Sequence, residues 1–142
     1  MCSSDLRMCD DDYICNAMDL VASGGGVMQL HCESGNIIEY LENKLIAEGH
    51  THPTDFPRAC PDWAEEEAIN RAVQMSSATR CPTYVVHLST HLGMERIKQA
   101  QSLGQAVWTE TCPQYLLLSD AEMARVGPLA KIGPPLRADD DP

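Results

Sequence analysis

The sequence has few basic and few aromatic residues. The first shortage argues against two classes of binding partner, and the second predicts the composition of the core. Only 10 Lys and Arg stand against 21 Asp and Glu, which gives a formal net charge of −11. Nucleic acids and anionic membranes attract basic patches, so we expect neither as a partner. Aromatic residues make up 5% of the 142 residues, with a single Phe. The core is therefore expected to be aliphatic.

Several motifs that define other protein classes are also missing. No apolar run approaches the ~20 residues of a membrane span. The absence of a Gly-x-Gly-x-x-Gly or Walker loop argues against a nucleotide-binding fold. The seven cysteines are odd in number, lack Cys-x-x-Cys spacing and follow no secretory signal. We therefore expect reduced thiols, mostly small core residues, in a cytoplasmic protein.

The composition allows one folded unit. Hydrophobic residues form 44% of a chain that has the length of one ordinary domain. Residues 1–6, MCSSDL, show no periodicity and lead abruptly into a helical pattern. CSSDL also matches the translation of a common sequencing adapter. We predict that residues 1–6 are a non-native leader and leave them out of the fold.

Apolar periodicity predicts helices that alternate with strands. The four main helices are predicted at 10–23, 36–48, 62–80 and 92–103. Short apolar runs bounded by Gly or Pro predict strands at 27–32, 83–89 and 106–113. A proline-rich excursion at 50–61 separates the second helix from the third, and a last short helix follows the third strand. This order predicts an α/β fold with right-handed crossovers and about three parallel strands.

The third helix has the strongest pattern. Asp62 is predicted to cap its start, and Glu65 to Glu67 lie in its first turns, where the helix dipole favours negative charge. The stripe expected to face the core consists of Ile69, Ala72, Val73 and Ser76.

Two histidines, His31 and His87, share one position in the pattern. Each closes an apolar strand and precedes a turn into a helix. Active sites of parallel α/β barrels lie at the carboxyl ends of the strands. Neutral imidazole on a rigid strand end is well placed to bind zinc. A single histidine is more often structural, but two in the same position leave a zinc site and a structural role both open.

The remaining candidates are weighed in the same way. His50 and His52 form a His-x-His pair, but they follow a helix within the proline-rich stretch, so we interpret them as surface loop residues. His91 opens a helix and is expected at the surface, with a supporting role beside the site as the alternative. Glu110, near the end of the third strand, either orients a ligand or forms a hydrogen bond at the rim. Cys32 is interpreted as packing.

Three stretches resemble one enzyme family. They are HCESGNIIEYLENKLIAEG, the strand YVVHLS, and WTETCPQYLLL running on to PPLR. Their order and spacing are similar to the middle of dihydropyrimidinases and hydantoinases, which are cyclic amidases of the amidohydrolase superfamily. The resemblance extends from about Arg7 over nearly the whole chain. It implies a (β/α)8 (TIM) barrel with two metals, usually zinc, of which residues 7–142 are the middle part.

The resemblance also implies roles for single residues. His31 and His87 match the histidines of the fifth and sixth barrel strands, which ligate the more solvent-exposed metal. Gly133 matches the start of a segment whose backbone contacts the substrate ring, where most relatives carry Ser. The upstream His-x-His, the bridging carboxylated lysine and the aspartate that acts as general base would lie outside this chain. No catalytic base is therefore expected here.

The implied activity is metal-dependent ring opening of a dihydropyrimidine or a 5-substituted hydantoin. It would belong to a longer homo-oligomeric enzyme, a tetramer, and the 142-residue chain alone is expected to be inactive. Three alternatives stay open: an allantoinase or dihydroorotase with the same ligands, a non-catalytic dihydropyrimidinase-like scaffold, and an unrelated α/β binding domain. The sequence TETCPQYLLL favours the hydantoinase branch, and the presence of both histidines argues against a scaffold. The unrelated domain is favoured only if the two imidazoles lie far apart.

Overall fold

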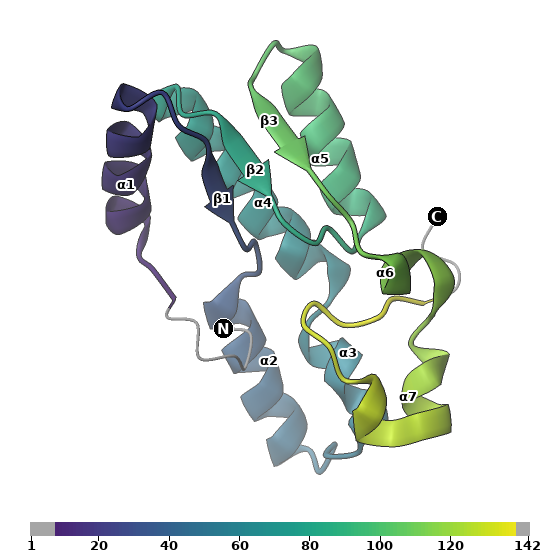
Figure 1. Cartoon of the computed structure of the whole chain (residues 1–142). Coiled ribbons are helices and arrows are strands. Elements are labelled where there is room, and N and C mark those ends of the chain that lie inside the picture. The colour runs from purple at the N-terminus through teal and green to yellow at the C-terminus, as the bar shows by residue number, and fades with distance from the viewer. Residues whose placement is uncertain (1–7, 139–142) are drawn as a thin grey trace.

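A three-stranded parallel sheet, in the order β1-β2-β3, lies at the centre of the computed structural model, which describes residues 8–138 (Figure 1). The strands are β1 (Met28–Leu30), β2 (Thr83–Val85) and β3 (Val107–Thr109). The register aligns Leu30 with Val85 and Val85 with Thr109. The predicted α/β fold is confirmed, but each strand is shorter than its apolar run. The prediction for residues 1–6 lies outside the described residues.

The four main helices begin and end within one residue of their predicted bounds. These four are α1 (Asp11–Ser23), α2 (Gly35–Ala47), α4 (Asp62–Thr79) and α5 (His91–Ser102). Three shorter helices are α3 (Phe56–Ala59), α6 (Pro113–Leu117) and α7 (Ala121–Val126). Two 3-10 turns, η1 (Pro53–Asp55) and η2 (Gly127–Ala130), complete the described elements. The excursion at 50–61, predicted as irregular, therefore holds η1 and α3. Among the described residues, no helix is long and apolar enough to cross a membrane.

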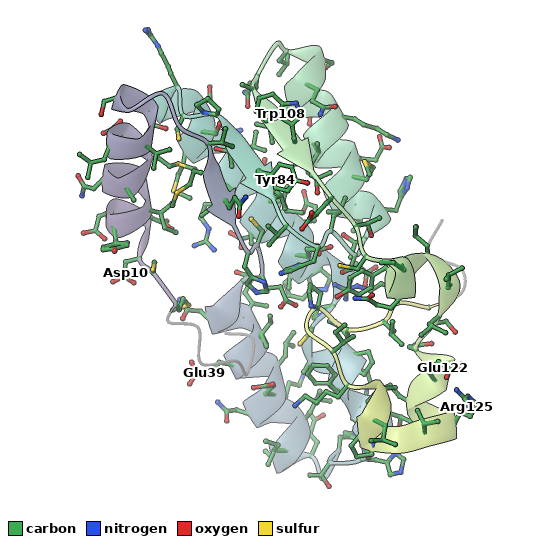
Figure 2. The ribbon with its side chains drawn as sticks, in the orientation of Figure 1. Asp10, Glu39, Tyr84, Trp108, Glu122 and Arg125 are labelled. Carbon is green, nitrogen blue, oxygen red and sulfur yellow. The ribbon has the colours of Figure 1, made fainter. Side chains whose placement is uncertain are left out.

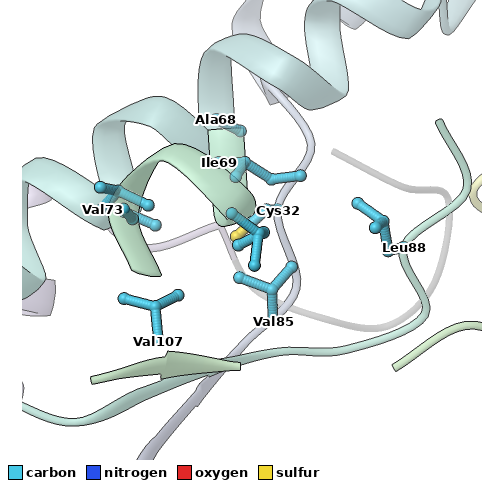
Figure 3. Packing of buried hydrophobic residues seen from close by; sticks show 10 residues of the cluster. Cys32, Ala68, Ile69, Val73, Val85, Leu88 and Val107 are labelled. Carbon is cyan, nitrogen blue, oxygen red and sulfur yellow. The ribbon is translucent and has the colours of Figure 1, made fainter. Parts of the chain in front are cut away.

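Helices α4 and α5 pack against each other and cover one face of the sheet, with α1 beside α4 (Figure 1). The core between them is aliphatic, as predicted, and Figure 3 shows its centre. Its buried residues are Cys32, Ala68, Ile69, Ala72, Val73, Val85, Leu88, Ile97, Ala100 and Val107. The opposite face of the sheet carries Gln29, Tyr84 and Trp108 in register. Figure 2 labels Tyr84 and Trp108 on this face, and Trp108 is 46% exposed.

The start of α4 differs from the prediction. Pro61 occupies the N-cap position and makes no side-chain cap, while Asp62 is the first helical residue. The predicted buried stripe of α4 is confirmed, because Ile69, Ala72, Val73 and Ser76 are all buried. The buried face also includes Glu65, which the dipole argument had assigned only to the first turn.

Gly93 allows α5 to approach α4 closely. A Cβ atom at this position would lie 2.6 Å from Cδ1 of Ile69 and 2.7 Å from Cδ1 of Leu88. Ala normally stabilises a helix interior by about 1 kcal/mol over Gly. We expect the opposite sign here, with Gly93→Ala lowering the free energy of unfolding by about 1–3 kcal/mol through overpacking. Urea denaturation measures the change, and Glu95→Ala on the exposed face of α5 is the control. A stabilised Gly93→Ala variant would contradict the close packing.

Candidate metal centre

His31 and His87 meet at the carboxyl end of the sheet. His31 follows β1 directly, and His87 comes two residues after β2. Nδ1 of His31 lies 2.7 Å from Nε2 of His87, and the ring centroids are 4.7 Å apart with the planes at 64°. The prediction that the two imidazoles lie together on adjacent parallel strands is confirmed. The condition that would have favoured an unrelated binding domain is therefore not met.

The backbone around His87 holds its ring in this position. His87 has a φ of 44°, in the left-handed region that costs a non-glycine residue free energy. Hydrogen bonds on both sides support this conformation: the Val86 N–H donates to the Leu30 carbonyl at 3.1 Å, and the Leu88 N–H donates to the Glu110 carbonyl at 2.8 Å. The chain after β2 is thus held between β1 and the end of β3.

Glu33 lies on the far side of His31. Its Oε2 is 3.2 Å from Nε2 of His31, and the Glu33 side chain is only 2% exposed. A carboxylate at this atom favours the tautomer with the proton on Nε2, which leaves the lone pair of Nδ1 facing His87. Burial, and then the neighbouring His31, lower the pKa of His87 below its usual value. The His87 ring is therefore expected to be neutral at pH 7, as a metal ligand must be.

The arrangement fits one metal ion held by two imidazoles. Zinc binds histidine nitrogens at about 2.0–2.1 Å, so two ligand atoms of one zinc are at most about 4 Å apart. The 2.7 Å between Nδ1 of His31 and Nε2 of His87 satisfies that limit. A catalytic zinc usually has three protein ligands. Within residues 8–138, no group of three or more His, Cys, Asp or Glu side chains is placed to hold a metal. The pair therefore fits part of a ligand set.

The other histidines have partners in their own segments. His52 accepts a hydrogen bond from the Thr54 N–H at 3.4 Å and closes a capping box at η1, while Nδ1 of His50 lies 3.6 Å from Asp55. His91 is the first residue of α5, and its Nε2 lies 3.9 Å from Glu95. These placements agree with the expected surface positions. That His50 and His52 bind no catalytic metal stays a prediction.

Glu110 takes part in a hydrogen bond at the rim of the sheet. Its Oε2 accepts from the Tyr84 hydroxyl at 3.2 Å, and its backbone supports the loop after β2. This geometry fits the second of the two roles expected for Glu110.

Cys32 is a core residue, as the packing interpretation predicts. Burial, and then the charge of Glu65, raise the pKa of its thiol to about 12. Since the thiolate is the reactive form, we expect iodoacetamide at about pH 8 to leave Cys32 unmodified in the folded chain and to alkylate it in guanidinium. Peptide mass spectrometry reads both results, with the partly exposed Cys112 as the internal comparison. Rapid native alkylation of Cys32 would contradict its burial. Only three of the six described cysteines are buried, so the thiols are less uniformly core residues than predicted.

The segment 133–137 returns to the loop after β2. Gly133 is exposed, whereas Pro134, Pro135 and Leu136 are buried. The Tyr115 hydroxyl donates to the Pro134 carbonyl at 2.8 Å. The Arg137 guanidinium donates to Oγ of Ser89, two residues after His87, from Nε at 3.1 Å and from Nη2 at 2.9 Å. The candidate substrate segment thus lies beside the loop that carries a candidate ligand, and the role of Gly133 stays a prediction.

Sequence reasoning did not identify the buried charges at this place. Glu65 and Arg137 are 2% and 9% exposed, and Ser89 lies between them. A signal was available in the sequence, because Glu65 precedes Ile69, Ala72, Val73 and Ser76 at helical spacing on the same face. An acidic residue within a core stripe indicates a buried partner. No sequence pattern identified that partner as Arg137.

The chain is similar to hydantoinases, an allantoinase and a dihydropyrimidinase over most of its length. No family model matches the chain. It is 34% identical to the D-hydantoinase of Geobacillus stearothermophilus over 125 residues, 88% of this chain and 26% of the relative. It is equally identical to the allantoinase of Bacillus velezensis over 139 residues, 98% of this chain and 31% of the relative. The chain therefore spans about a quarter to a third of the length of these relatives.

Solved structures give the same result. The D-hydantoinase of Bacillus sp. AR9 superposes with a TM-score of 0.94 at 33% identity, over 99% of this chain and 31% of that protein. The dihydropyrimidinase of Brevibacillus agri superposes with a TM-score of 0.94 at 32% identity and with the same coverage.

Proposed function

Because this chain belongs to the hydantoinase and dihydropyrimidinase family of cyclic amide hydrolases, we propose that it contributes part of the metal centre of such an enzyme. His31 and His87 are two ligands of one metal in this proposal. The observation that carries it is the 2.7 Å approach of their ring nitrogens at the carboxyl ends of adjacent strands. The reaction is hydrolysis of a ring C–N bond in a dihydropyrimidine or a 5-substituted hydantoin.

The chain is proposed to form the middle part of a (β/α)8 barrel, with residues 7–142 in that role. The sheet supports this placement, because helices cover one of its faces while Gln29, Tyr84 and Trp108 line the other. In a barrel, side chains on the face opposite the helices fill the interior. The complete enzyme is proposed to be a cytoplasmic homotetramer, as the resemblance implies.

The residues of this chain would prepare the metal site. Nδ1 of His31 and Nε2 of His87 would donate lone pairs to the metal, and the nearby Glu33 carboxylate would favour the required tautomer of His31. Burial keeps His87 neutral by lowering its pKa. When bound, two zinc ions would polarise the ring carbonyl and supply a hydroxide nucleophile near neutral pH. The bridging lysine and the general base belong to other parts of the enzyme in this proposal.

The backbone of Gly133 is proposed to contact the substrate ring. Gly133 is exposed at the start of a buried segment whose last residue, Arg137, contacts Ser89 in the loop after β2, and this supports the role. Glycine offers no hydroxyl, so only backbone hydrogen bonds to the ring are available at this position. Allantoin is a second candidate substrate, because the match to an allantoinase covers 98% of the chain.

A chimeric enzyme tests the proposal. In the Geobacillus stearothermophilus D-hydantoinase, the segment that this chain matches is replaced by this chain's own residues. We expect the purified chimera to bind zinc and to open the ring of 5-phenylhydantoin or dihydrouracil. A second chimera in the Bacillus velezensis allantoinase is assayed with allantoin, and the host that keeps the larger share of its own rate identifies the branch. Folded, zinc-loaded chimeras that are both inactive would contradict the proposal.

A further inference from the structure

A buried carboxylate in α4 lies at the centre of a hydrogen-bond cluster that the metal pair does not require. Oε1 of Glu65 accepts hydrogen bonds from the backbone N–H of Ser89 at 3.0 Å and from its Oγ at 3.1 Å. Oε2 of Glu65 accepts a short hydrogen bond from the Thr90 hydroxyl. Burial raises the pKa of Glu65, and the hydrogen bond from Thr90 and the charge of Arg137 oppose that rise.

Arg137, near the C-terminus, completes the cluster. Its Nε and Nη2 donate to Oγ of Ser89 at 3.1 and 2.9 Å, and its Nη1 donates to the Cys60 carbonyl at 2.5 Å. Nη2 also lies 4.0 Å from Oε2 of Glu65. The Ser89 hydroxyl therefore accepts from the guanidinium while it donates to the carboxylate. One oxygen atom connects two nearly buried charges.

Stability alone does not explain such a cluster. Burying two charges costs desolvation free energy, and well-packed apolar residues are often at least as stable. What the cluster does provide is geometry, because the planar guanidinium directs its donors at fixed angles. It joins three segments that are distant in sequence: the first turn of α4, the loop after His87, and the segment 133–137.

We propose that Glu65, Ser89 and Arg137 form a clamp that positions the segment 133–136 against the loop carrying His87. Arg137 is the next residue after this segment, and Ser89 lies two residues after His87, so the clamp sets how the two approach each other. The Tyr115 hydroxyl, bound to the Pro134 carbonyl at 2.8 Å, is a second attachment of the same segment. In the complete enzyme, these positioning residues set the distance between the histidine pair and the backbone of Gly133. This role rests on the proposed function.

Residue-resolved amide hydrogen exchange on the 142-residue chain tests the clamp without any assay of activity. The Asp120 N–H donates to the Arg137 carbonyl at 2.8 Å and reports on the clamped segment. The Thr83 N–H donates to the Ala106 carbonyl at 2.9 Å and reports on the sheet. Ser89→Ala removes only the bridging hydroxyl. We expect it to accelerate exchange at Asp120 roughly tenfold or more, as for a lost hydrogen bond to a charged group, with Thr83 unchanged.

Arg137→Lys separates geometry from charge. Lysine keeps the charge but cannot reach both Oγ of Ser89 and the Cys60 carbonyl with a rigid fork, so we expect the same acceleration at Asp120. Glu66→Gln, one residue from Glu65 but paired with Arg96 on the surface, is the matched control and should change neither amide. Unchanged exchange at Asp120 in Ser89→Ala, or full protection in Arg137→Lys, would overturn the clamp. Equal acceleration at Asp120 and Thr83 would show a general stability role instead.

The chimeric enzyme extends the test to the site. There, Ser89→Ala is expected to raise KM for the hydantoin with kcat and zinc content nearly unchanged, because the ligands are intact and substrate binding is loosened. An unchanged KM in an active chimera would reject the effect on the site. An inactive parent chimera would count against the proposed function, while the exchange result would still decide whether the clamp exists.

Discussion

The His87→Ala variant of the chimeric enzyme is expected to lose ring-opening activity by a factor of at least about 100. Removing a residue that only supports a metal ligand already costs about 10- to 100-fold in metal affinity or activity. His87 contributes Nε2 itself, 2.7 Å from Nδ1 of His31. The variant is expected to retain less zinc, measured by atomic emission after dialysis, and His31→Ala should behave alike.

Two further variants show whether the effect belongs to this pair. The double variant His50→Ala and His52→Ala should keep its zinc and its activity, because these side chains interact with Thr54 and Asp55 in their own segment. Glu33→Gln should weaken zinc binding by about 10- to 100-fold, since a neutral amide beside Nε2 of His31 favours the Nε2–H tautomer less than the carboxylate does. Full zinc content and activity in His87→Ala would exclude His87 as a ligand.

The 142-residue chain alone is expected to show no cyclic amidase activity, even with excess zinc. Its described residues bring together two imidazoles, whereas a catalytic zinc usually needs three protein ligands. Within residues 8–138, no group of three or more His, Cys, Asp or Glu side chains is placed to hold either metal of a two-metal site. The strands β1 and β3 also have unpaired outer edges within the described sheet, which favours association between chains.

The measurement follows ring opening of dihydrouracil and of 5-phenylhydantoin by the purified chain, with the parent chimera as the positive control. A zinc titration by calorimetry on the same sample shows whether the histidine pair binds metal weakly by itself. Zinc-dependent turnover that disappears in His87→Ala would show that the two histidines and their surroundings suffice for catalysis. That result would contradict the expectation from ligand number.

Local patterns accounted for the four main helices but not for the strand lengths. Helix bounds depend on residues within a turn or two of each end, so periodicity and stop residues place them within one residue of the structure. A strand ends where pairing with its neighbour ends. The apolar run at 83–89 continues beyond Val85, but β2 ends at Val85, and His87, two residues later, has a left-handed conformation. Pairing of this kind is not visible in a single segment.

The candidate site shows the same division. The alternation of helices and strands already predicted a parallel sheet. Two histidines at equivalent strand ends are then expected at the same, carboxyl end of that sheet. The sequence by itself therefore determined the fold class, the four main helices and the neighbourhood of His31 and His87. Only the tertiary structure decided that Nδ1 of one ring faces Nε2 of the other, and that Glu33 lies behind His31. It also decided that Glu65 meets Ser89 and Arg137. Periodicity states which face of a helix is buried, but a hydrogen bond depends on distance and direction between segments that only folding brings together.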